Sequence, residues 1–146
     1  MRQLKKFLCP TDFSETALEA LRYAVDLARS QGAEIELLHV HHVPLHGADV
    51  KAPKTVDDLP PALRKDLERR LALQQEQLDL TGVTLHASLA VGVPHEAIVA
   101  AAKRVGADLI VMGTEGHSGL ARMLIGSVTD RVLRTSDRAV LTVRRK

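Results

Sequence analysis

The sequence predicts an α/β fold in which strands and helices alternate around a largely parallel sheet. Short apolar segments alternate along the chain with longer segments whose apolar residues recur at helical spacing. One short segment, Ala107–Met112, reads ADLIVM, an apolar run typical of a strand covered on both faces. The chain has 146 residues, of which 45% are hydrophobic. We therefore expect residues 1–146 to form a single domain with its own core.

The first part of the chain predicts a strand, a helix and a second strand. Leu4–Cys9 reads as a short buried strand that Pro10 ends. Ser14 follows a turn-forming sequence and is placed to cap a helix, and Gly32 is placed to end it. Ala33–Val40 then alternates as a strand with two apolar faces.

The middle of the chain is less regular. His41–Leu59 contains prolines, a glycine and two adjacent aspartates, and is predicted as a loop. A plain surface excursion and a lid over a binding site are both open for it. Leucines repeat every four residues from Leu63, which predicts an amphipathic helix to about Leu78. Val83–Val91 alternates as a third strand.

The last part of the chain predicts two more helices and two more strands. A helix starts near Pro94, where a missing N–H is harmless, and ends at Gly106. Ala107–Met112 is the fourth strand, Val128–Thr135 an amphipathic helix, and Ala139–Val143 the last strand.

A glycine-containing loop, Gly113–Thr129, joins the fourth strand to the last helix. A strand, then glycines, then a helix is the arrangement of many anion-binding loops. We expect the glycines to let the backbone approach a ligand and adopt dihedrals closed to other residues. Ser127 opens the helix and, with Asp130, forms a Ser-x-x-Asp capping signature. The loop lacks a P-loop lysine motif. On the glycines alone, an ordinary strand-to-helix turn explains the pattern equally well.

Composition excludes several classes of protein. The net charge of +2 is too balanced for an electrostatic nucleic-acid surface, and the 2% of aromatic residues offer few stacking platforms. The single cysteine, Cys9, cannot form a disulfide within the chain. The amino-terminal apolar stretch is too short for a signal peptide, and no run approaches membrane-spanning length. We therefore expect a cytoplasmic protein without a nucleic-acid or membrane partner.

The spacing Gly113-x2-Gly116-x9-Gly126-Ser127 resembles the G-2x-G-9x-G-[S/T] motif of the ATP-binding universal stress proteins. The resemblance extends to PTDFS at the end of the first strand, to GVP before the third helix and to ADLIVMGTEG. It implies a five-stranded parallel sheet of order 3-2-1-4-5 with helices on both faces, a Rossmann-like α/β fold. Ligands bind such sheets where the strand order reverses, which would place Asp12 and Gly113 on opposite sides of one cleft.

The resemblance also implies which residues contact the nucleotide. The expected base and ribose contacts are Pro10, Thr11, Asp12, Val40 and Met112. The expected phosphate-loop contacts are Gly113, Gly116, Gly126, Ser127 and Val128, with hydroxyl donors from Ser118 and Thr129.

Two of these positions have competing interpretations. The Asp12 carboxylate could accept ribose hydroxyls or help hold a nucleotide-bound Mg²⁺ through water, or it could form an Asx turn before the first helix. His117 could contact phosphate or point to solvent.

The histidines His39, His41, His42 and His46 lack the converging partners of a metal site, so we expect no metal site formed by the protein alone.

We therefore expect an ATP-binding regulatory or protective module, with ATP or AMP as ligand, Mg²⁺ on the phosphates and no catalytic residues. Two alternatives remain open: a slow ATPase or phosphotransferase, and a nucleotide-free dimeric scaffold. The last strand would lie at a sheet edge, and the resemblance implies a homodimer paired through it. The residues of that interface would be Ala139, Val140, Leu141, Thr142 and Val143.

Overall fold

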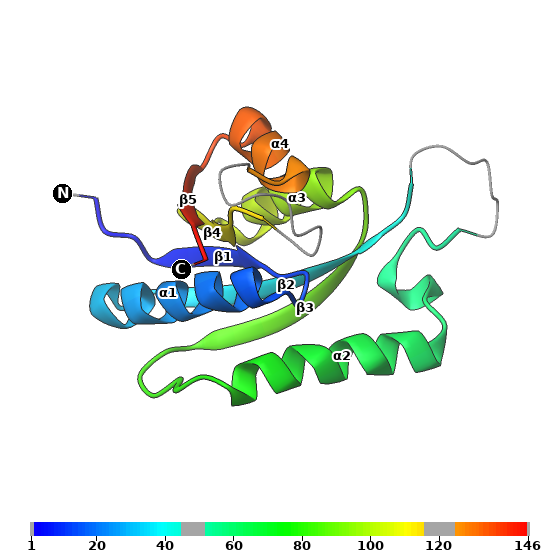
Figure 1. Cartoon of the computed structure of the whole chain (residues 1–146), viewed down its shortest axis with the longest axis horizontal. Helices are drawn as coiled ribbons and strands as arrows, with labels where there is room; N and C mark the ends of the chain where they lie inside the picture. Colours follow the sequence, from blue (N-terminus) through cyan, green and yellow to red (C-terminus); the bar gives the residue numbers. More distant parts are fainter. Residues whose placement is uncertain (1, 45–51, 116–124, 146) are drawn as a thin grey trace.

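The computed structural model describes residues 2–44, 52–115 and 125–145, and over these residues it contains one five-stranded sheet (Figure 1). Every pair of neighbouring strands is parallel, and the order β3-β2-β1-β4-β5 confirms the expected one. The strands are β1 (Lys6–Pro10), β2 (Glu34–His42), β3 (Leu85–Gly92), β4 (Leu109–Gly113) and β5 (Ala139–Val143).

Helices cover both faces of this sheet, as expected for a parallel sheet (Figure 1). The helices are α1 (Glu15–Gln31), α2 (Pro61–Glu76), α3 (Pro94–Val105) and α4 (Ser127–Thr135). Helices α1 and α2 lie on one face, and α3 and α4 lie on the other. Within the described ranges, every helix is too short or too polar to cross a bilayer.

The two faces of the sheet carry separate apolar cores because side chains alternate along each strand. Phe7 and Ile35 are fully buried against α1, together with Leu71 of α2. Leu8 and Leu38 are fully buried on the opposite face, against α3 and α4. The alternation predicted for the second strand is therefore confirmed.

The ends of the first helix follow the predicted chemistry. The Ser14 side chain accepts a hydrogen bond from the Ala17 amide at 3.2 Å. Gly32 takes a left-handed conformation with φ of 68°, and its amide donates to the Ala28 carbonyl. Gly106 ends α3 in the same way, with φ of 69°.

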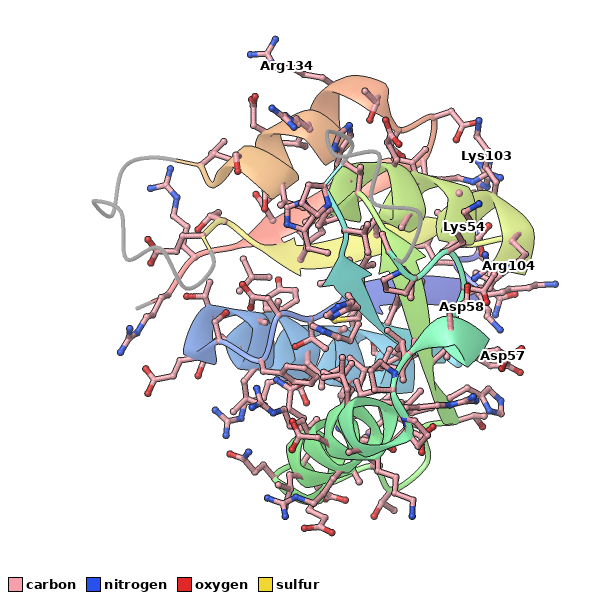
Figure 2. The ribbon with its side chains drawn as sticks, turned by 90° about the vertical axis from the view of Figure 1, so that its right-hand side faces the viewer. Lys54, Asp57, Asp58, Lys103, Arg104 and Arg134 are labelled. Atoms are coloured by element: carbon pink, nitrogen blue, oxygen red, sulfur yellow. The ribbon has the colours of Figure 1, made fainter. Side chains whose placement is uncertain are left out.

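The prediction of one long loop over His41–Leu59 is wrong at both ends. Strand β2 continues to His42 because β3 continues beside it, pairing Val91 with His41 and Gly92 with His42. A short 3₁₀ helix, η1 (Val56–Asp58), occupies the other end, and residues 45–51 lie outside the described residues. The Asp58 carboxylate accepts the amides of Lys54 and Thr55 at 3.0 Å, which fixes the start of this turn (Figure 2).

Other element boundaries shift by a few residues. Strand β1 begins at Lys6 and includes Pro10, and β3 begins at Leu85.

Lys103 and Arg104 lie on the outward side of α3, and Arg134 lies on the outward side of α4 (Figure 2). These cations therefore mark the solvent face of the layer that covers the second core.

The chain reverses its direction across the sheet between β1 and β4. After β1 it builds outward through β2 and β3, and it then returns to place β4 and β5 on the other side of β1. β1 is followed by α1 on one face of the sheet and β4 by α4 on the other, which leaves a crevice at the carboxyl ends of these strands.

Candidate functional site

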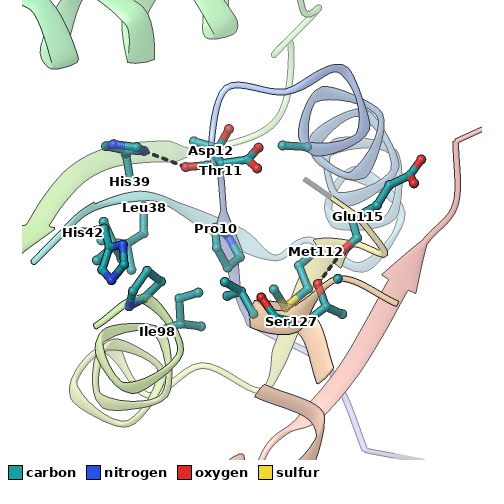
Figure 3. A pocket seen from close by; sticks show the side chains of 17 residues that line it. Pro10, Thr11, Asp12, Leu38, His39, His42, Ile98, Met112, Glu115 and Ser127 are labelled. Atoms are coloured by element: carbon teal, nitrogen blue, oxygen red, sulfur yellow. Dashed lines mark hydrogen bonds between the residues drawn. The ribbon is translucent and has the colours of Figure 1, made fainter. Parts of the chain in front are cut away.

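A cavity of about 340 Å³ lies at the carboxyl ends of β1, β2 and β4 (Figure 3). Ligand pockets are typically ~300–1,000 Å³, so this volume is sufficient for a small molecule. The first residues of α3 and α4 close its other sides. Its lining residues are Pro10, Thr11, Asp12, Ala17, Leu38, His39, Val40, His42, Pro94, Ile98, Met112, Gly113, Glu115, Gly126, Ser127, Val128 and Thr129.

Most of the residues predicted as site residues line this one cavity, although they come from distant parts of the sequence. They are Pro10, Thr11, Asp12, Val40, Met112, Gly113, Gly126, Ser127, Val128 and Thr129. Gly116, His117 and Ser118 lie outside the described residues.

Sequence reasoning missed part of the apolar wall. Leu38 lines the cavity, and its place two residues before Val40 on the same strand face could have indicated this. Ile98 follows Pro94 by four residues, the spacing that puts both on one side of α3. His39, His42, Ala17 and Glu115 also line the cavity, and no sequence signal distinguished them.

The amino terminus of α4 opens into the cavity without a side-chain cap. Its N-cap is Gly126, and Ser127 is the first helical residue, so the predicted Ser127–Asp130 capping signature is wrong. The Asp130 carboxylate pairs instead with the Arg134 guanidinium at 3.1 Å. The first amides of a helix have no acceptor within the helix and lie at the positive end of its dipole. In α4 these amides belong to Ser127, Val128 and Thr129, which line the cavity.

The hydroxyl of Thr129 was predicted to donate to the ligand, but it serves the protein. It donates to the Gly113 carbonyl at 2.7 Å, and Thr129 is 4% exposed. A second bond joins the Gly126 amide to the Thr114 carbonyl. These two bonds fix the first turn of α4 against the end of β4, and so fix the position of its first amides at the cavity.

Gly113 is required for close packing and not for an unusual dihedral. Neither Gly113 nor Gly126 takes a left-handed φ, which corrects the expectation for both. A Cβ at Gly113 would lie 2.7 Å from Cγ2 of Thr16 and 3.2 Å from its carbonyl carbon. Gly113 therefore lets β4 approach the first turn of α1 closely.

The turn after β1 forms the wall opposite α4. The Asp12 carboxylate accepts the Ser14 amide at 3.0 Å, which is the Asx turn considered as an alternative role. The Thr11 hydroxyl accepts the Phe13 amide at 3.0 Å and donates to Oε1 of Gln74 at 2.9 Å. Both side chains thus organise the turn itself.

His39 connects this turn to β2. Its Nδ1 lies 2.8 Å from the Thr11 carbonyl oxygen (Figure 3). A carbonyl only accepts, so Nδ1 carries the hydrogen and Nε2 of the neutral ring is an acceptor. The ring stacks on Phe13 with centroids 4.3 Å apart. Burial lowers the pKa of His39, and the hydrogen bond to Thr11 opposes this shift.

Among the described lining residues, the charged side chains are the carboxylates of Asp12 and Glu115. No lysine or arginine is among these described residues, and the amides at the start of α4 are the groups among them that favour an anion. No group of three or more histidine, cysteine, aspartate or glutamate side chains in the described part of the chain is placed to hold a metal ion.

The family model described as the universal stress protein family matches residues 3–144. This chain belongs to the universal stress protein family. Universal stress protein MJ0577 of Methanocaldococcus jannaschii is 32% identical over 155 aligned residues, covering 97% of this chain and 96% of that protein. The solved structure of MJ0577 superposes with a TM-score of 0.79 over 99% of both chains.

Two more distant solved structures share the fold of this universal stress protein. One is a universal stress protein in complex with cAMP, with 24% identity, a TM-score of 0.73 and 98% coverage of both chains. The other is a universal stress protein from Archaeoglobus fulgidus in complex with dAMP, with 22% identity and a TM-score of 0.68. The alignment covers 99% of this chain and 100% of that one.

The contact between Gly113 and Thr16 predicts a compensating pair of substitutions. Gly113→Ala should lower the free energy of unfolding by about 1–3 kcal/mol, because the new methyl group overlaps Thr16. Thr16→Ser removes the nearest atom, so the double variant should be more stable than Gly113→Ala alone. Urea unfolding of the four proteins tests this, and an unchanged stability of Gly113→Ala would contradict it.

The lowered pKa of His39 predicts a pH dependence of stability. The unfolded chain takes up a proton at about pH 6.5, before the folded chain does. The free energy of unfolding should therefore fall as the pH falls below about 6.5. His39→Asn keeps a donor for the Thr11 carbonyl and does not titrate, so its stability should fall less between pH 7.5 and 5.5. Parallel pH profiles of the two proteins in urea unfolding would contradict this assignment.

Proposed function

We propose that this universal stress protein is a regulatory or protective module that binds adenine nucleotides, with ATP as the ligand. The observation that carries the proposal is the uncapped amino terminus of α4, which opens into a cavity at the strand-order reversal. A helix end of this kind favours phosphate through its free amides and its dipole.

The rest of the cavity suits a base and a sugar. Leu38, Val40, Ile98 and Met112 give the cavity an apolar wall. Such a wall can cover a flat heterocycle, and the thioether of Met112 adapts to its shape. An adenine against this wall would leave the phosphates directed towards Ser127. The apolar base and the charged phosphates would then fix the orientation of the ligand.

The relatives support adenine as the base. The cAMP and dAMP in the two structures named above both contain adenine, as ATP does. The position of the cavity at the switch point of the sheet also agrees with the general site of nucleotide binding in open α/β sheets.

Magnesium would enter this site on the phosphates of the nucleotide. The described residues supply no three-ligand group, but Asp12 and Glu115 are carboxylates at the cavity lining and could accept hydrogen bonds from metal-bound water. The ion would reduce the repulsion between these carboxylates and a triphosphate.

We propose binding as the function, with turnover at most slow. Efficient phosphoryl transfer needs charge neutralisation and an oriented nucleophile. The described lining offers no cationic side chain, and the Asp12 carboxylate holds the turn before α1. We place this function in the cytoplasm, where the buried free thiol of Cys9 would stay reduced.

The proposal predicts a difference between two substitutions at one position. Ser127→Pro removes the first amide of α4, and proline is tolerated there because Gly126 is extended, with ψ of 155°. Its affinity for ATP should fall roughly 10–100-fold, the value of a hydrogen bond to a charged group. Ser127→Ala removes only the hydroxyl and should bind nearly as the native protein does.

Isothermal titration of ligand-stripped protein with ATP, AMP and cAMP measures these affinities. The absence of binding to every adenine nucleotide by the native protein would refute the proposed function. Equal affinities of Ser127→Pro and Ser127→Ala would instead show that this amide does not hold phosphate.

We also propose that the chain forms a homodimer through β5. In the described sheet β5 pairs with β4 on one side and forms the sheet edge on the other. Its residues Ala139–Val143 are apolar or β-branched, and such an edge can pair with a second copy. The pairing would join the two sheets around a two-fold axis.

Light scattering should therefore give twice the chain mass of 15.9 kDa at micromolar concentration. A mass equal to that of one chain at every concentration from roughly 1 to 100 µM would contradict the dimer.

A further inference from the structure

Thr11 connects the two faces of the sheet. It lines the cavity, but its hydroxyl turns away from the cavity and donates to Oε1 of Gln74 at 2.9 Å. Gln74 belongs to α2, which does not line the cavity and lies on the face of the sheet that carries α1. Gln74 is 5% exposed, so this bond is made in the protein interior.

The Thr11–Gln74 bond is one of the buried contacts that attach α2 to the rest of the molecule. The buried residues of α2 are Leu67, Leu71 and Gln74. The two leucines pack against apolar groups and allow small shifts of the helix. The amide of Gln74 instead has a directional bond, which fixes the last turn of α2 relative to the turn after β1.

A second contact joins the same two segments. The guanidinium of Arg70 in α2 lies 5.8 Å from the centre of the Phe13 ring, within cation–π range. Phe13 in turn stacks on His39, which lines the cavity. Phe13 also has a φ of 67°, a conformation that residues other than glycine rarely adopt. The turn is therefore held in a conformation that needs support from its surroundings.

We propose that Gln74 is a positioning residue for the nucleotide site. It acts from the far face of the sheet by holding Thr11, and through Thr11 it sets where Pro10 and Asp12 stand along the cavity wall. The inference rests on the nucleotide binding proposed above. Loss of the Gln74 bond leaves the buried Thr11 O–H without an acceptor beside the strained Phe13, so the wall shifts and the ligand binds less tightly.

The coupling acts in both directions. If the position of α2 affects nucleotide affinity, then bound nucleotide affects how firmly α2 is docked, because coupling free energies are reciprocal. Nucleotide binding therefore holds the last turns of α2 more firmly against the sheet. Binding at the nucleotide site would therefore change how firmly α2 is held on the face of the sheet that carries α1.

A double-mutant cycle tests the positioning role. Thr11→Val and Gln74→Leu each remove one partner of the bond with little change of shape, and each should weaken ATP binding about tenfold. The double variant should bind about as weakly as Thr11→Val alone, because Gln74→Leu removes only the shared bond, whereas Thr11→Val also removes the acceptor of the Phe13 amide. If Gln74→Leu weakens ATP binding by the same factor in the native and the Thr11→Val backgrounds, Gln74 does not act through Thr11 and the inference is overturned.

Two control variants separate positioning from loss of stability. Arg69→Ala changes an exposed neighbour on α2, and Val25→Ala lowers stability within the same apolar core but away from the turn. Both should keep native affinity for ATP. A loss of affinity in Val25→Ala that matches the loss in Gln74→Leu would show that general destabilisation explains both results, and would overturn the inference.

Amide hydrogen exchange supplies a readout that a merely structural role would not change. Saturating ATP should slow exchange in the last turns of α2 in the native protein, and it should not do so in Gln74→Leu. Native affinity in Gln74→Leu overturns the positioning role and leaves the proposed function intact. A native protein that binds no adenine nucleotide overturns both, so the two failures are distinguishable.

Discussion

The short pairing between β1 and β4 is the constraint on which the site depends. These neighbours pair through Phe7 with Leu109 and through Leu8 with Ile110. At their amino-terminal side the Asp108 carboxylate joins them, because it accepts the amides of Lys5 at 2.9 Å and Lys6 at 3.1 Å. The same hydrogen bonds lower the pKa of Asp108, so its carboxylate stays ionised at neutral pH. Beyond Leu8 and Ile110 the two strands are followed by α1 and α4 on opposite faces of the sheet, and the cavity lies at the ends of the strands.

The parts of this arrangement that the sequence predicted are those governed by local periodicity. Alternation placed Leu38 and Ile35 on opposite faces, and turn chemistry placed Ser14 and Gly32 at the ends of α1. The strand order came from the resemblance to a family, since periodicity carries no information on which strands are neighbours. Ends of elements shifted where a partner strand supplied hydrogen bonds, as β3 does for the last residues of β2.

The roles of individual site residues were harder to predict, because they depend on partners far away in the chain. Spacing singled out Gly113 but suggested backbone freedom, whereas the structure shows close packing on Thr16. The hydroxyl of Thr129 was assigned to the ligand, and it bonds to the Gly113 carbonyl. In each case the sequence located the residue, and the tertiary contact determined what it does.

The proposed phosphate contacts are main-chain amides, so the part of the affinity that comes from them should not change with pH. Main-chain amides do not titrate, and the neutral ring of His39 is held by burial and by the Thr11 carbonyl. The positioning role proposed for Gln74 would instead control affinity through the geometry of the cavity walls. The β1–α1 turn is the wall best suited to this, because Thr11 meets the cavity with its backbone and meets α2 with its hydroxyl. The strained φ of Phe13 agrees with control through this turn. A relaxed turn would hold its position without Arg70 and Gln74, and changes at these residues would then not move it.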